Sequence, residues 1–97
     1  MTDKPEVDLY KKGVHVLMDN IHTESCKEAI EFILKQSYEV NKPKKLQLLI
    51  CSDGGDMNAA FALIDIIRGS KIHIDTVGLG IIGSAGLLIF MAVLIVY

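Results

Sequence analysis

The chain has 97 residues, with ten Lys and Arg against twelve Asp and Glu and a formal net charge of -2. This length allows one small domain or part of one and excludes a two-domain enzyme. Hydrophobic residues make up 51% and charged residues 23%, which excludes wholesale disorder. The slight acidic excess argues against a nucleic-acid-binding surface, and Lys42, Lys44 and Lys45 around Pro43 are typical of a solvated turn.

Two cysteines, Cys26 and Cys51, are too few for a disulfide scaffold and too far apart for a CxxC motif. We expect both to be reduced thiols in the core of a cytoplasmic protein. Residues 1–12 form a polar segment without the apolar run of a secretory signal.

The first predicted strand, residues 13–18, is short, apolar and bounded by turn residues. A helix follows and ends at about Tyr38, with Thr23 or Ser25 as its cap and Glu28 at capping-box spacing from Ser25. Its apolar face recurs at helical spacing and consists of Cys26, Ala29, Ile30 and Ile33.

The second strand, residues 46–52, is nearly all apolar, which predicts a strand covered on both faces in a parallel sheet. A turn at 53–56 leads into a helix from about Met57 to Arg68, with Gly69 as its C-cap. This helix has few polar residues, so we expect it to be buried on most sides, in part by a partner surface or by chain missing from this sequence.

A third strand is predicted at 72–77, a glycine-rich loop at 78–83, and a third helix from about Ser84. Strands that alternate with helices imply parallel strands joined by right-handed crossovers. The predicted fold is therefore α/β, with the order βαβαβα.

Residues 77–97 contain no charge and are long enough to span a membrane. Four glycines crowd into the first ten positions, where they would interrupt a spanning helix. The uninterrupted apolar run from Ala85 onward fits a buried core helix better, so a C-terminal membrane anchor is the less favoured alternative.

Parallel sheets place their sites at the carboxyl ends of the strands, where two glycine-rich loops are expected here, at 52–55 and 80–86. Ser84 is the one hydroxyl in the second loop and is a candidate nucleophile at a strand-to-helix turn. The N–H groups of Gly55 and Ala85 could form an oxyanion hole for it. The local pattern alone favours Ser84 as a simple helix cap, and it could equally cradle a phosphate.

These two loops resemble signatures of the ClpP family, the proteolytic subunits of ATP-dependent Clp proteases. Ser52-Asp53-Gly54-Gly55 is similar to the family's S-P-G-G, and Gly80-Ile81-Ile82-Gly83-Ser84-Ala85-Gly86 is similar to its G-x-A-A-S-M-G. The spacing between the two signatures matches without a gap. The resemblance runs from about Gly13 to Met91, so residues 13–97 are interpreted as the N-terminal part of a ClpP-like (crotonase-like) domain.

The resemblance implies that Ser84 is the nucleophile, that the N–H groups of Gly55 and Ala85 form the oxyanion hole, and that Gly54, Gly83 and Gly86 support the loops. Three residues depart from the family pattern: Asp53 replaces proline, Ala85 replaces methionine and Gly83 replaces alanine.

The resemblance also implies a serine endopeptidase that hydrolyses unfolded polypeptides through an acyl-enzyme, without metal or organic cofactor. It implies a homo-oligomeric ring in the cytoplasm, fed by an AAA+ Clp ATPase unfoldase that consumes the ATP. The family's triad His and Asp lie further along than Tyr97, so we expect a truncated chain that is inactive alone. His15, His22 and His73 are predicted to be structural or exposed, not substitutes for the triad His.

Two alternatives from other classes remain. The chain could be a non-catalytic homologue that packs into a peptidase ring and modifies it, with the apolar second helix as its assembly surface. It could also be a small protein with a C-terminal membrane anchor whose likeness to the peptidase is accidental.

Overall fold

The computed structural model describes residues 7–94. Residues 1–6 and 95–97 lie outside this part, and with them the first half of the predicted polar segment and the end of the apolar run. Within the described residues, strands and helices alternate in the predicted order βαβαβα.

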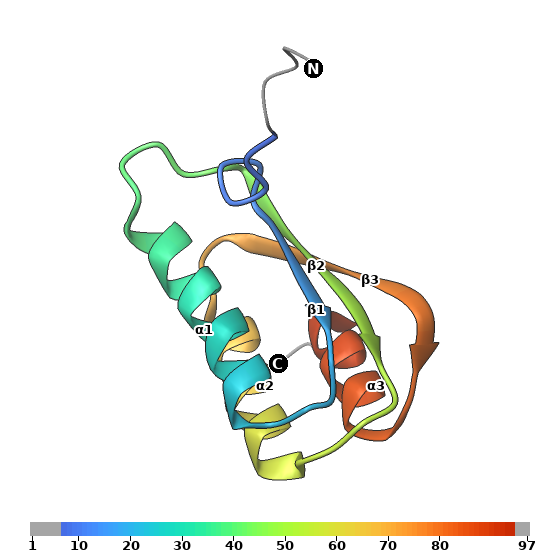
Figure 1. Ribbon diagram of the computed structural model, residues 1–97. Coiled ribbons are helices and arrows are strands. Elements are labelled where there is room, and N and C mark those ends of the chain that lie inside the picture. Colours follow the sequence, from blue (N-terminus) through green and yellow to red (C-terminus); the bar gives the residue numbers. More distant parts are fainter. Residues whose placement is uncertain (1–6, 95–97) are drawn as a thin grey trace, which may run out of the picture.

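The sheet has three parallel strands in the order β1-β2-β3, with β2 in the centre (Figure 1). Their bounds are Val14–Met18 for β1, Lys45–Ser52 for β2 and His73–Ile82 for β3. The carboxyl ends of the strands therefore lie along the same edge of the sheet. The α/β prediction with parallel strands is confirmed.

Three helices, α1 (Thr23–Tyr38), α2 (Met57–Gly69) and α3 (Ser84–Met91), cover one face of the sheet, and a 3-10 turn (Ala92–Leu94) follows. Side chains along β2 alternate between buried and less buried positions. This alternation shows that β2 is covered on one face only, so the prediction of two covered faces is wrong.

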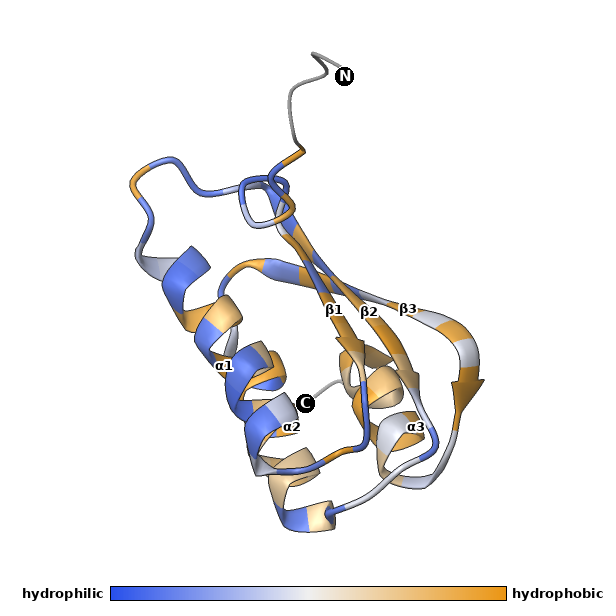
Figure 2. Cartoon of the chain, viewed as in Figure 1, coloured by the Kyte–Doolittle hydropathy of each residue, from blue (hydrophilic) through white to orange (hydrophobic). Residues whose placement is uncertain are grey.

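The core lies between the helices and the covered face of the sheet, and Figure 2 shows the apolar residues of the strands and α3 around it. Its most deeply buried large side chains include Ile33, Leu48, Ile50, Leu63 and Ile89. Removing this apolar area from water stabilises the fold by roughly 25 cal/mol per Å².

Cys26 lies in this core, as predicted, whereas Cys51 is only half-buried. Cys51 alternates along β2 with the buried Ile50 and Ser52, so its side chain lies on the uncovered face of the sheet. Both thiols are free.

The N-cap of α1 is His22, not Thr23 or Ser25 as predicted. Its Nδ1 accepts hydrogen bonds from the N–H groups of Glu24 and Ser25, at 3.2 and 3.3 Å. Ser25 Oγ in turn accepts from the N–H of His22 at 3.0 Å. An imidazole nitrogen thus takes the acceptor role that a serine or aspartate oxygen usually has, and Ser25 is the reciprocal partner.

Helix α2 begins at Met57, as predicted, but includes Gly69 and ends on Ser70 as its C-cap. One face is buried, while Met57 and Phe61 on another are 39% and 50% exposed. The chain itself therefore buries only one side of α2, and the predicted cover by a partner surface or further chain stays a prediction.

Strand β3 is longer than predicted because the glycine-rich stretch continues it. Ile50 pairs with Gly78 and Ser52 pairs with Ile82, so β3 carries extra residues in an irregular bulge between these pairs. Gly80, at φ +62°, supplies the left-handed turn of the bulge. The bulge brings the end of β3 level with the end of β2.

The uncharged C-terminal run forms the end of β3, the eight-residue α3 and the 3-10 turn, as far as it is described. In residues 7–94, no helix is long and apolar enough to cross a membrane.

Candidate active site

Backbone contacts join the ends of β2 and β3 at the carboxyl edge of the sheet. The N–H of Gly83 donates to the carbonyl oxygen of Ser52 at 2.8 Å. A Cβ on Gly86 would lie 3.2 Å from the same oxygen, so the first turn of α3 packs directly on β2. The two loops singled out in the sequence therefore meet in space, as their place after parallel strands predicts.

Ser84 is the first residue of α3 and has a backbone φ of +49°. Among the described residues, it is the only one other than glycine with a positive φ. The left-handed conformation costs an L-residue roughly 1–2 kcal/mol, so the turn at Ser84 is strained. Such strain is characteristic of sharp strand-to-helix turns that expose a nucleophilic serine.

The side chain of Ser84 does not cap the helix. The N-cap of α3 is Gly83, without a side-chain hydrogen bond, so the interpretation of Ser84 as a simple cap is wrong. Ser84 is exposed, and in the described part of the chain its hydroxyl forms no hydrogen bond. The hydroxyl group is therefore available to a bound molecule.

Gly54 lies directly against this hydroxyl. Its φ is +120°, and a Cβ at this position would lie 2.8 Å from the Cβ and 3.3 Å from the Oγ of Ser84. Only glycine combines this backbone conformation with so close an approach. The predicted supporting role of Gly54 thus has a steric basis.

The N–H of Gly55 faces away from Ile21, toward the end of β3 that leads into Ser84. The N–H of Ile21 donates to the carbonyl of Gly54 at 2.9 Å, and the N–H of Asp56 donates to the carbonyl of Ile21 at 2.7 Å. In this parallel pairing the flanking residues bond to Ile21, so the N–H of Gly55 itself points away from it. The strand order places the end of β3 on that side.

Ala85 is fully buried, at the second position of α3. The first N–H groups of an α-helix have no partner within the helix, and they carry the positive end of its dipole. The carboxyl edge of the sheet therefore offers the free hydroxyl of Ser84, the N–H of Gly55 and the first N–H groups of α3. Such an arrangement can hold a developing oxyanion. The roles of Ser84, Gly55 and Ala85 in such chemistry stay predictions.

No histidine of the described part forms a hydrogen bond with Ser84. His73 lies at the start of β3, with the length of the strand between it and Ser84, and its Nε2 is 2.7 Å from Asp75 Oδ1. His15 packs on the ring of Phe32 at a centroid distance of 5.1 Å, and burial lowers its pKa. His22 caps α1.

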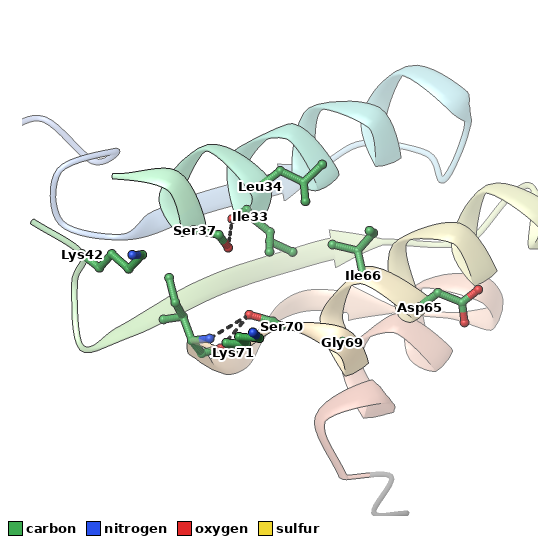
Figure 3. A pocket seen from close by; sticks show the side chains of 10 residues that line it. Ile33, Leu34, Ser37, Lys42, Asp65, Ile66, Gly69, Ser70 and Lys71 are labelled. Carbon is green, nitrogen blue, oxygen red and sulfur yellow. Dashed lines mark hydrogen bonds between the residues drawn. The ribbon is translucent and has the colours of Figure 1, made fainter. Parts of the chain in front are cut away.

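A groove of about 600 Å³ between α1 and α2 lies at the other edge of the sheet, at the amino ends of β2 and β3 (Figure 3). Lys42 and Lys71 line it, and the hydroxyl of Ser70 is occupied by hydrogen bonds with the backbone of Ile72. A smaller depression of about 270 Å³, lined in part by Cys51, Asp53 and Ile81, adjoins the candidate site.

Two further residues shape the site through contacts that the sequence pattern did not assign to them. Ser52 is 3% exposed, and its Oγ accepts a hydrogen bond from the N–H of Gly54 at 3.2 Å. Ile21 fixes the Gly54–Gly55 segment through its backbone. The signal for Ser52 was present, since a serine two residues before a glycine pair can stabilise a tight turn. No residue pattern could identify a purely backbone partner such as Ile21.

Comparison with known proteins gives a consistent result. The sequence model of the family described as Clp protease matches residues 2–95. An ATP-dependent Clp protease proteolytic subunit 2 of Treponema pallidum is 36% identical over 74 residues, which are 71% of this chain and 36% of that protein. The protein of the same name from Borreliella burgdorferi is 39% identical over 62 residues, which are 64% and 30% of the two chains.

Solved structures of ClpP1 from Listeria monocytogenes, wild type and the N165D mutant, superpose with a TM-score of 0.78 at 25% identity. The match covers 87% of this chain and 48% of theirs. The present chain thus spans less than two fifths of these curated relatives and about half of the solved chains.

Proposed function

This chain belongs to the Clp protease family, and we propose on that premise that it carries the nucleophile of a serine peptidase acting on unfolded polypeptides. The observation that supports this most directly is the free hydroxyl of Ser84, held at a positive φ against Gly54. Strain of this kind persists only where the surrounding structure imposes it, and it concentrates at functional sites.

In the proposed reaction, Ser84 Oγ attacks the carbonyl carbon of the scissile peptide bond and transfers its proton to a general base. The N–H groups of Gly55 and Ala85 stabilise the resulting oxyanion. The tetrahedral intermediate then expels the amine, which takes the proton from the base, and leaves an acyl ester on Ser84. Attack of water on this ester releases the acid and restores the serine.

The base and the residue that orients it come from outside residues 7–94 in this proposal. A serine hydroxyl needs such a base, and no described histidine contacts Ser84. The curated relatives are much longer than the part matched here, so their unmatched part is the proposed source. The 97-residue chain alone is then inactive.

The proposal extends to the assembly. The relatives' names describe ATP-dependent proteolytic subunits. We propose a homo-oligomeric ring in the cytoplasm, to which an AAA+ Clp ATPase delivers unfolded chains. The ATP is consumed by that unfoldase and not by this chain.

A chimera tests the catalytic role. Residues 1–97 are joined to the part of the Treponema pallidum subunit that follows the matched region, and hydrolysis of a fluorogenic peptide is measured. We expect turnover in the chimera and none in the 97-residue chain. Ser84→Ala abolishes turnover, whereas Ser70→Ala, at the other edge of the sheet, preserves it. Turnover that persists in the Ser84→Ala chimera removes Ser84 from its role.

A second candidate function is non-catalytic packing into a ring of full-length subunits. It is favoured by an apolar surface on α2 and α3, where Phe61, Leu88 and Met91 line a cavity of about 330 Å³ and are 50%, 39% and 43% exposed. Co-expression with a full-length relative tests it. Phe61→Ser weakens co-purification if this surface mediates assembly, and Phe61→Ser that co-purifies like the wild type counts against it.

A further inference from the structure

The outer edge of β1 is open beyond Val14, whose N–H donates to the carbonyl of Leu9 at 2.9 Å. Within the described residues β1 pairs only with β2. The N–H of Gln47 donates to the carbonyl of Gly13 at 2.7 Å, so the ladder to β2 continues through His15 and Leu17. The N–H and carbonyl of Val16 consequently point away from the sheet, and an edge of this kind can pair with another extended chain.

A groove of about 430 Å³ runs between this edge and α1. It has an aromatic base: the rings of His15 and Phe32 lie 5.1 Å apart, and the ring of Tyr10 meets Phe32 edge-on at 6.1 Å. The backbone edge and the helix thus form two walls around a common floor.

The helix wall of the groove is acidic toward the end nearer Met18. Glu28 and Glu31 line the groove, and Glu24 lies one turn before Glu28 on the same helix face. None of the three forms an ion pair within the described residues, although Lys35 follows Glu31 by one turn. Lys35 lies at the other end of the groove, beside Tyr10.

We propose that the outer edge of β1 binds an extended peptide segment with Lys or Arg at alternate positions. Backbone pairing with Val16 would add the segment to the sheet as a further strand. Alternate side chains of a strand repeat at roughly 6.6 Å, whereas the rise along α1 is about 6 Å from Glu24 to Glu28 and about 4.5 Å from Glu28 to Glu31, a difference that long Lys or Arg side chains can span. This binding does not depend on the role of Ser84.

The test uses a blocked eight-residue peptide of alternating Lys and Thr, with a fluorescent label, and the 97-residue chain. Anisotropy titration should show affinity at least about tenfold higher than for the Glu–Thr counterpart. The double variant Glu28→Gln/Glu31→Gln should weaken binding by about fivefold, because exposed ion pairs contribute modestly. Asp65→Asn, which removes one negative charge on α2, should leave the affinity unchanged.

Two peptides test the backbone pairing, one N-methylated at every threonine and the other at every lysine. One of the two should lose binding, because alternate amides of a strand face the same edge. Amide chemical shifts in the labelled chain should move in β1 and along the Glu28 face of α1.

Equal affinity for the Lys and Glu peptides, binding that survives both N-methylations, or shifts confined to β3 would overturn the proposal. Self-association of the chain through β1 in the absence of peptide would also count against it. The salt dependence of the wild-type affinity is a readout that needs no variant, and affinity that does not fall with rising salt contradicts the proposal.

Discussion

The two edges of the sheet are built in opposite ways. At the carboxyl edge, the ends of the strands approach through backbone, and Gly54, Gly55 and Ser84 all have positive φ. At the amino edge, charged side chains dominate: Lys45 Nζ lies 3.3 Å and His73 Nε2 lies 2.7 Å from the two oxygens of Asp75.

The larger groove lies at the amino edge, where the only described residue with a positive φ is a glycine, Gly13, and the strained turn at Ser84 lies near the smaller depression. Cavity size alone would therefore direct attention to the amino edge, away from the candidate site. Close backbone approach and an exposed hydroxyl in a costly conformation are the more specific signs of a site, because neither persists without a surrounding structure that imposes it.

The largest difference between the two edges should appear in the free energy of unfolding when one glycine at each edge is replaced by alanine. A Cβ on Gly55 would lie 2.1 Å from the carbonyl oxygen of Ile21, whereas a Cβ on Gly69 meets nothing within 4 Å. We expect Gly55→Ala to lower the free energy of unfolding by about 3–5 kcal/mol, from the clash and the unfavourable φ.

The matched variant Gly69→Ala should raise the free energy of unfolding by about 0.5 kcal/mol, since alanine is the better helix former. Urea denaturation followed by circular dichroism measures both. Equal stabilities for the two variants would show that the Gly55 segment relaxes freely and that the carboxyl edge is not rigid.

Replacing one serine at each edge with glycine should change the stability by a smaller amount, and with opposite sign at the two edges. Ser84→Gly removes a side chain from the left-handed region and should stabilise the fold by about 0.5–1 kcal/mol. Ser70→Gly removes a hydroxyl that bonds the backbone of Ile72 and should destabilise it by about 1–2 kcal/mol. Thermal unfolding of the two variants checks the signs. Destabilisation by Ser84→Gly would mean that the turn at Ser84 is not strained.

Much of the fold was predictable, because apolar periodicity and turn residues mark the elements. The spacing of Cys26, Ala29 and Ile33 predicted the buried face of α1, and those residues are buried. The order of the elements then placed Gly55 and Ser84 at one edge. These inferences need only local patterns and the geometry of parallel strands.

Other features depend on tertiary contacts that local sequence does not encode. Leu49 and Cys51 are apolar whether or not a layer covers them, so the uncovered face of β2 could not be distinguished from a covered one. The glycines near the end of β3 indicated a loop, whereas they continue the strand through a bulge. Glycine permits both structures, so the residue type alone does not distinguish them. The cap formed by His22 depends on which ring nitrogen accepts, which residue type does not specify.

The smallest expected effect concerns the charges of the amino edge. The hydrogen bond from His73, followed by that from Lys45, lowers the pKa of the Asp75 carboxyl below its ordinary value of 3.8. His73→Gln should therefore raise this pKa most and Lys45→Gln less, whereas Lys44→Gln, beside Lys45, should leave it unchanged. Carboxyl carbon shifts in an NMR pH titration measure each value.

The sign of the linked stability follows from that depressed pKa. A carboxyl whose pKa is lower in the folded chain stabilises it above the unfolded pKa and loses that contribution as pH falls through the folded value. The loss from Asp75 therefore lies below about pH 4, and His73→Gln should reduce the stability difference between neutral and acid pH. Lys45 and His73 are largely exposed and Asp75 is 39% exposed, so screening keeps the effect small. An unchanged Asp75 pKa in His73→Gln would show that the two side chains are not held together in solution, and the amino edge would then lack the fixed side-chain geometry that distinguishes it from the backbone-built carboxyl edge.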